Sequence, residues 1–304
     1  MLLDSFLAAG IGLATPILLA ALGEVMVERT GVLNIGLEGV MLSGAFAAAV
    51  AANSTGSPLA GAAAAALTGV GVELAFAAAC VLLDADAIIA GTAINLLALG
   101  ATGALYRSLY GATGAVLILP TLPNLAVPIL SSLPVVGRAL FAQHALVYLG
   151  LALTPLLAAL LSRTGLGLRL RALGDQPLAA TSLGFSVRGM RFATLGVAGG
   201  LGGLAGATLT LAAANTFVEG ISAGRGFIAL AVVVFGGWSP WGALVGSLLF
   251  GFASALQFQF QAAALAVPYQ VFLMLPYVLT LGVLAFSRDV KRAPRALGAT
   301  EEPP

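Results

Sequence analysis

Two clusters of polar residues interrupt the otherwise apolar stretches of this chain. Asn34 and Glu38 are four residues apart, so they would share one face if the segment is helical. A carboxylate in so apolar a stretch is costly to bury and usually faces a cavity or a partner. One interpretation is that this pair lines a polar pathway beside a broken helix. In the other, Glu38 is a packing group bonded to nearby backbone. Glu24, Glu28 and Arg29 would then form an interfacial loop.

The second cluster contains Asn215, Glu219 and Arg225. Arg225 is expected to pair with Glu219, either as an ordinary ion pair of a loop or as part of the same pathway. Both interpretations remain open at this point.

Other isolated polar residues are expected to be structural. Glu73 stands deep in an apolar run, and Thr92 and Asn95 are one turn apart in the next. Such side chains often form hydrogen bonds across helices. His144 lies where an apolar segment begins, and we expect it to be interfacial rather than catalytic.

The sequence carries no pattern of residues typical of an enzyme. It has no nucleophile motif beside its histidine, and no phosphate-binding loop, zinc spacing or dinucleotide fingerprint. Its one cysteine excludes a disulfide or a Cys-based metal site within the chain. We therefore predict no catalytic residue, no metal site and no cofactor in this chain.

The composition is that of a protein with many membrane spans. Hydrophobic residues make up 60% of the 304 positions and charged residues 8%, far from the averages of soluble domains. The net charge of +1 gives no argument for nucleic acid. Because 39 residues are glycine, helix backbones can approach closely. We predict an all-α polytopic membrane protein, a bundle of about 8–10 transmembrane helices.

Nine segments are apolar enough to be membrane helices or parts of them. They are 5–23, 31–52, 58–83, 87–106, 143–161, 190–214, 226–237, 241–257 and 267–287. Together they form one predicted transmembrane domain over residues 1–290, and the topology places the N-terminus outside.

A polar loop over 163–191 divides the apolar sequence. It contains five arginines, which by the positive-inside rule places it in the cytoplasm. Within it, Pro177 can begin a short helix that Asp175 caps and Gly184 ends. We predict that another protein contacts this short helix.

Two further segments are predicted to lie outside the bundle. Residues 107–142 hold four prolines and are expected to form an external loop. Residues 291–304 are a short cytoplasmic tail, and 293–304 is expected to be disordered. Basic residues precede and enter this tail, as the cytoplasmic side requires.

A faint internal repeat is visible at two Ser-Pro pairs. Ser57-Pro58 and Ser239-Pro240 each open an apolar run after a preceding apolar segment. On the predicted topology the two units have opposite orientations, as in the inverted repeats of transporters. Chance recurrence and an inverted repeat remain equal alternatives here.

Three blocks of sequence resemble one family. They are GEVMVERTGVLNIGLEGVMLSGAF at 23–46, LRLRALGDQPLAATSLGFSV at 168–187 and GRGFIALAVVVFGGWSPWGALVGSLLFG at 224–251. In this order they resemble the ABC importer permeases for branched-chain amino acids, simple sugars and nucleosides. The first block is most similar to the simple-sugar and nucleoside branch, because Ile35 follows Asn34 where the amino-acid branch carries an aromatic residue.

The resemblance implies a type II importer subunit in the cell inner membrane. Its expected partners are a cytoplasmic ABC ATPase holding ATP and Mg²⁺, a second permease subunit, an extracytoplasmic substrate-binding lipoprotein and membrane lipid. The implied coupling helix would fall on Gly174, Asp175, Gln176, Pro177, Ala179, Ala180 and Gly184. Asp175-Gln176 departs from the family's frequent Glu-Asn but keeps a carboxylate.

The solute remains the open question. A nucleoside or sugar needs aromatic faces or amides, and the candidates for the path are Asn34, Glu38, Asn95, Phe46, Phe217 and Phe227. One alternative is a branched-chain amino acid permease. The other is an ion-coupled secondary transporter, with Glu38, Glu73 and Glu219 as ion sites.

Overall fold

The structure, a computed structural model, is an all-α bundle with one end drawn out into short helices. It describes residues 2–111, 117–126, 128, 136–262, 274, 278, 282 and 293–298. Seven of the described helices are long and apolar enough to cross a membrane. This confirms the predicted class of an all-α polytopic membrane protein.

The long helices follow the apolar segments of the sequence. They are α1 (Leu2–Glu28), α2 (Leu37–Thr55), α3 (Pro58–Ala77) with the π-helical turn η1 (Ala78–Leu82), α4 (Ala87–Tyr110), α6 (Ala145–Arg163), α9 (Val187–Thr208) with η3 (Leu209–Ala214), and α11 (Pro240–Ala262). An eighth apolar helix, α10 (Arg225–Phe235), has 11 residues. It rises only about 16 Å, roughly half of a bilayer core.

Eight of the nine predicted apolar segments coincide with these helices, and 267–287 lies almost wholly outside the described residues. The expected segment 31–52 is wrong at its start, because α2 begins only at Leu37. Gly31 has a φ of +85° and ends the first helix, so the chain reaches α2 through a non-helical segment.

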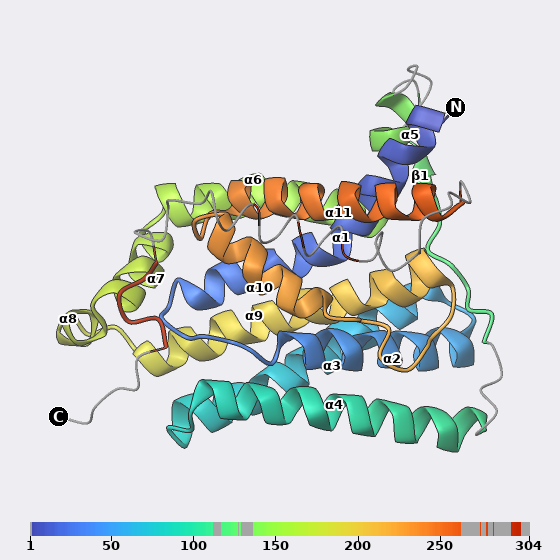
Figure 1. Cartoon of the computed structure of the whole chain (residues 1–304). Coiled ribbons are helices and arrows are strands. Elements are labelled where there is room, and N and C mark those ends of the chain that lie inside the picture. Colours follow the sequence, from blue (N-terminus) through green and yellow to red (C-terminus); the bar gives the residue numbers. More distant parts are fainter. Residues whose placement is uncertain are drawn as a thin grey trace.

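The helices form two units of similar order. The first is α1, the non-helical segment 29–36, α2 and α3, and the second is α9, the non-helical segment 215–224, α10 and α11. A Ser-Pro pair separates the last two helices of each unit. In Figure 1, α2 and α10 start near the middle of the bundle and run in opposite directions. This order supports the inverted repeat over chance recurrence.

The two units are interlocked. The most extensive helix contacts join α3 to α9 and α11 to α1, so each unit's last helix packs on the other unit's first helix. Small residues permit this approach. A Cβ on Gly203 of α9 would overlap the carbonyl oxygen of Ala65 in α3.

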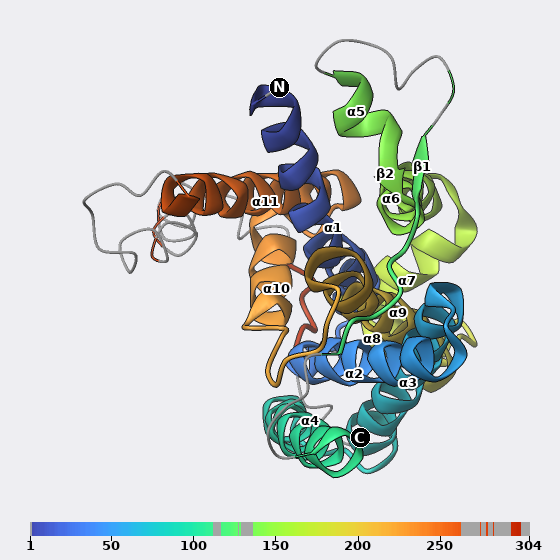
Figure 2. The same ribbon diagram turned by 90° about the vertical axis from the view of Figure 1, so that its right-hand side faces the viewer.

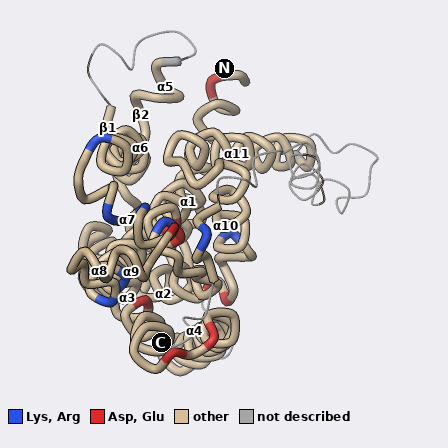
Figure 3. The backbone as a smooth tube through the Cα atoms, turned by 90° about the vertical axis from the view of Figure 1, so that its left-hand side faces the viewer, with Lys and Arg blue, Asp and Glu red and all other residues tan. Residues whose placement is uncertain are grey.

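The two ends of the bundle differ in character. One end carries α7 (Gly165–Asp175), α8 (Pro177–Ser182) and residues 293–298. Seen from that end, basic residues gather around α7, α8 and the start of α9 (Figure 3). The opposite end carries α5 (Val136–Phe141) and the antiparallel strands β1 (Asn124–Ala126) and β2 (Ala142–His144), as Figure 2 shows.

The connecting segments compare with the predictions in different ways. Within the predicted loop 107–142, the described residues form no long helix of their own: α4 ends at Tyr110 and β1 pairs with β2. Leu119 and Leu122 also donate backbone hydrogen bonds to the oxygens of Asn215 and Leu211, at 3.0 and 2.9 Å. The predicted disorder of 293–304 is wrong for 293–298, which forms a turn against the bundle.

Candidate functional site

The starts of α2 and α10 meet inside the bundle, and the side chain of Glu38 joins them. Its Oε1 accepts a hydrogen bond from the backbone N–H of Gly224 at 2.8 Å, and its Oε2 accepts one from Gly226 at 2.7 Å. These N–H groups belong to the first turn of α10, whose dipole favours a carboxylate there. Glu38 therefore caps a helix that lies 186 residues further along the chain.

Glycine is required where the two helices meet. A Cβ on Gly226 would lie 2.6 Å from both the Cα and the N of Glu38, a distance that Cβ atoms do not adopt. The α10 backbone thus rests directly on the first turn of α2. The sequence-based interpretation of Glu38 as a group bonded to neighbouring backbone describes this geometry.

Asn95 of α4 supports the same junction from the other side. Its Oδ1 accepts from the backbone N–H of Gly39 at 2.7 Å, and its Nδ2 donates to the oxygen of Ile35 at 2.9 Å. The amide thus spans the break at which segment 29–36 becomes α2. The prediction of bonds between helices is confirmed for Asn95, whereas Thr92 donates to Ile88 within α4.

Asn34 does not accompany Glu38. It is fully buried, and its Nδ2 donates to Glu24 Oε2 at 3.0 Å and to Glu73 Oε1 at 2.5 Å. Its Oδ1 accepts from the N–H of Gly36 at 3.0 Å. Because α2 begins at Leu37, the predicted shared helix face of Asn34 and Glu38 is wrong.

Sequence reasoning missed the buried carboxyl cluster around Asn34, which we call the Asn34 cluster (Glu24, Asn34 and Glu73). Glu24 was expected in an interfacial loop together with Glu28, but both lie on α1 and are buried. Glu28 accepts a hydrogen bond from the indole N–H of Trp238. Their i, i+4 spacing in an apolar helix was the available signal.

Aromatic candidates converge only in part. The ring centroids of Phe46 and Phe217 are 5.4 Å apart, and those of Tyr106 and Phe217 are 5.2 Å apart. Phe227, by contrast, is 48% exposed on α10. Phe46 also lines an apolar cavity of about 590 Å³ between α2, α3 and α4.

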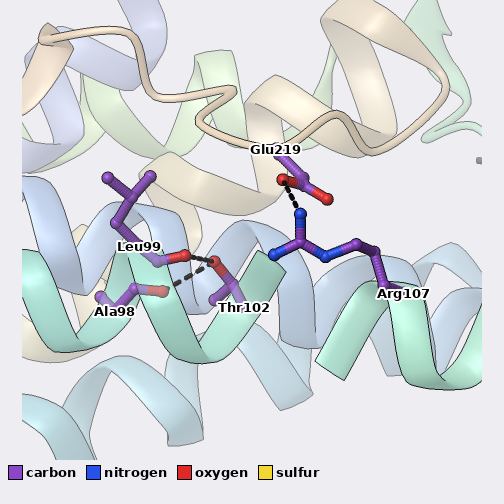
Figure 4. Close-up of polar contacts among 5 residues, drawn as sticks. All are labelled: Ala98, Leu99, Thr102, Arg107 and Glu219. Atoms are coloured by element: carbon purple, nitrogen blue, oxygen red, sulfur yellow. Dashed lines mark hydrogen bonds and ion pairs between the residues drawn. The ribbon is translucent and has the colours of Figure 1, made fainter. Parts of the chain in front are cut away.

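The second polar cluster forms a different ion pair from the one predicted. Glu219 pairs with Arg107 of α4 at 3.4 Å, and both side chains are substantially exposed (Figure 4). Arg225 Nη1 donates to the backbone oxygens of Ile221 and Ser222 at 3.1 and 3.3 Å. The expected pairing of Glu219 with Arg225 is therefore replaced by a link between α4 and segment 215–224.

The predicted short helix of the arginine-rich loop is present as α8. Pro177 begins it, and Gly184, with a φ of +80°, follows its end. The predicted cap is wrong, because Asp175 is the last residue of α7 and Gln176 precedes α8 without a side-chain cap. Of the expected coupling residues, Gly174 and Ala180 are buried, whereas the others are at least partly exposed: Asp175, Gln176, Pro177, Ala179 and Gly184.

Apolar side chains of this turn face outward. Leu178 and Leu183 are 77% and 72% exposed. The helix α8 lies at the outermost edge of this end of the bundle (Figure 1). The neighbouring Phe185 ring is covered by the guanidinium of Arg169 at 5.0 Å. Exposed apolar side chains that lie together and are rimmed by charged residues mark a surface that contacts a protein or a membrane.

His144 is buried at the opposite end, just before α6. Burial lowers the pKa of this imidazole to about 4, so it is neutral at physiological pH. Among the described residues, no three His, Cys, Asp or Glu side chains are grouped so that they could hold a metal ion.

The fold and this junction define a class of protein. Two interlocked units with broken helices, whose starts meet within a membrane bundle, are typical of solute permeases. The match to a family agrees: the model for the branched-chain amino acid transport system permease component covers residues 6–284. The chain belongs to this family and is a multi-pass membrane permease subunit of an ABC import system.

Relatives of known name match over nearly the whole chain. A guanosine ABC transporter permease of Bacillus subtilis is 37% identical over 94% of this chain and 92% of the relative. A nucleoside ABC transporter permease of Lactococcus lactis gives the same three values. A putative glucose ABC transporter permease of Haloferax volcanii is 35% identical over 92% of this chain and 91% of the relative. No solved structure matches the chain.

Proposed function

We propose that this chain conducts a nucleoside or a simple sugar inward, driven by a separate ATPase subunit that docks on α8. The observation that carries the docking site is a pair of exposed leucines, Leu178 in α8 and Leu183 directly after it, at the edge of the bundle. Two exposed leucines close together and flanked by arginines form a surface that we expect a partner to cover.

The orientation follows from charge. Arginines flank α8 on both sides, from Arg163 to Arg191, and we infer that this end is cytoplasmic. ATP and Mg²⁺ would then be held by the partner, since the sequence of this chain has no phosphate-binding loop. A second permease subunit and an extracytoplasmic binding lipoprotein complete the assembly that we propose.

The solute class rests on the relatives. Two of them are named for nucleosides or guanosine and one for glucose. Phe46, partly exposed at the cavity between α2, α3 and α4, offers an aromatic face of the kind that nucleobases and sugars contact, whereas Phe217 and Tyr106 are buried against each other. We favour a nucleoside over a sugar, and a branched-chain amino acid is the alternative that competition for uptake would reveal.

The junction at Glu38 suggests how movement reaches the solute. Because Glu38 bonds the first turn of α10, a shift of α2 must carry α10 with it or break two hydrogen bonds. Such a connection lets the two units move together, as alternating access by rocking of one repeat against the other needs.

The test replaces the exposed leucine of α8 and the one directly after it, in the variant Leu178→Asp with Leu183→Asp. The matched control is Leu125→Asp, which changes a leucine that is 48% exposed at the opposite end. We expect the double variant to weaken ATPase association by about tenfold or more, as loss of apolar anchors at an interface does. Co-purification and ATP-driven uptake in vesicles measure this.

Equal association of both variants would contradict the docking site. Uptake by the purified chain without any ATPase would instead support an ion-coupled transporter. That alternative needs free carboxylates. Glu38 bonds backbone N–H groups and Glu219 pairs with Arg107, whereas Glu73 bonds Asn34 through one oxygen and its buried Oε2 has no hydrogen-bond partner among the described residues.

A further inference from the structure

Residues 293–298 form a turn that fills the seam between α7 and the segment after α1. The N–H of Ala296 donates to the oxygen of Gly174 at 2.8 Å, and the N–H of Gly298 donates to the oxygen of Gly31 at 3.1 Å. The turn is closed by the N–H of Leu297, which donates to Pro294 at 3.2 Å. In Figure 1 this red segment lies at the end that carries α7 and α8.

The seam is packed at the level of the backbone. A Cβ on Gly174 would overlap the oxygen of Arg29 and lie 3.1 Å from the Cβ of Pro294. A Cβ on Gly31 would lie 3.2 Å from the oxygen of Ala296. Three segments distant in sequence are thus in direct contact, and none can shift without displacing another.

The turn is also anchored in the bundle. Pro294 is buried, and Ala293 and Leu297 pack against the main apolar core. Gly298 contacts Leu33, with 3.7 Å between its would-be Cβ and Leu33 Cδ2. A loosely attached tail would have neither the buried proline nor the two backbone hydrogen bonds.

The two residues whose oxygens accept these hydrogen bonds, Gly174 and Gly31, lie close to functional segments of the chain. Gly174 lies three residues before Pro177, the first residue of α8, and Gly31 lies three residues before Asn34. Beyond Asn34 the chain enters α2 and reaches Glu38, which holds the start of α10. The turn therefore joins the base of α8 to the segment that leads to the junction of the two units.

We propose that residues 293–298 are a positioning element of the transport cycle, which passes a displacement of α8 to segment 29–36. The proposal rests on the proposed function, because it assumes that an ATPase moves α8. Without the turn, α7 keeps its direct contact with Arg29 but loses the link through Ala296 and Gly298, so each ATP hydrolysed moves less solute.

The experiment compares two truncations in the reconstituted complex of permease, ATPase and binding protein. One ends after residue 292 and removes the turn, and the control ends after residue 299 and keeps it. We expect the first to bind ATPase and hydrolyse ATP, with solute moved per ATP reduced by roughly tenfold, about what one strong hydrogen bond contributes. We expect the control to match the full chain.

Point variants of the full chain test the same proposal if the truncated chain does not fold. Ala296→Pro removes the N–H that bonds Gly174, whereas Ala296→Ser keeps it. We expect Ala296→Pro to lower solute moved per ATP and Ala296→Ser to leave it unchanged. A purely structural turn would lower the unfolding temperature of Ala296→Pro and leave that ratio unaltered.

The outcomes separate the two proposals. Normal coupling in the truncation after residue 292, or equal coupling in Ala296→Pro and Ala296→Ser, would overturn the positioning role. Failure of the full chain to bind ATPase would overturn the proposed function itself, and the turn would then have no displacement to transmit.

Discussion

The two non-helical segments hold corresponding places in the two units, yet they are anchored in opposite ways. Segment 29–36 is fixed by buried side chains, since Thr30 and Asn34 are fully buried and Asn34 bridges two carboxyl groups. Segment 215–224 is more exposed, although Phe217 and Ser222 are buried, and it is held by turns, by Glu38 and by the exposed ion pair of Arg107 and Glu219.

The difference teaches which of the two segments is internally rigid. A buried polar network is costly to disturb because every broken bond leaves a group without water. Turns and exposed ion pairs rearrange at small cost. We therefore expect segment 215–224 and α10 to move during transport, while segment 29–36 shifts as one body with α2.

The largest effect is expected from Asn34→Asp. It removes the amide that donates to Glu24 and Glu73 and adds a third carboxyl group to a buried site. We expect the free energy of unfolding to fall by about 3 kcal/mol. Thermal unfolding in detergent micelles measures this change.

The matched control is Asn215→Asp, at the start of the mobile segment. Asn215 is exposed and has a φ of 55°, a conformation that Asp also tolerates. An equal loss of stability in the two variants would remove the contrast between the segments.

A smaller effect on stability, but a clear one on transport, is expected from Glu38→Ala. It leaves the N–H groups of Gly224 and Gly226 without their acceptor and separates the two units at their junction. We expect ATP-driven uptake to fall roughly thirtyfold, equivalent to about 2 kcal/mol. Glu38→Gln keeps one acceptor oxygen and should be intermediate. Unchanged uptake in Glu38→Ala would show that the junction does not link the units.

The smallest effect is expected from Glu219→Gln. Its ion pair with Arg107 is exposed, with 41% and 56% of the two side chains accessible, so solvent screens most of the attraction. We expect a coupling energy below about 0.5 kcal/mol in a double-mutant cycle with Arg107→Gln. A coupling energy well above that value would mean that segment 215–224 is as firmly anchored as segment 29–36.

Local features of the sequence predicted local structure well. The Ser-Pro pairs open α3 and α11 as expected, and Pro177 and Gly184 bound α8. The start of α2 was predicted six residues too early, because apolar composition continues through segment 29–36 although the helix does not. The partners of Glu219 and Asn34 were not predictable, since each lies on another element.

By itself, the sequence determined that this protein is a bundle of membrane helices with an arginine-rich loop. It also determined that the chain belongs to a family of permeases. Hydropathy suffices for that, because a bilayer demands about twenty apolar residues with their backbone bonds satisfied within each helix. Only the tertiary structure decided that Glu38 caps α10, that Asn34 bridges buried carboxyl groups and that residues 293–298 close the seam beside α8. A hydrogen bond depends on the distance between two groups in space and not along the chain. Here the partners lie on distant segments that the packing of glycine-rich helices brings together.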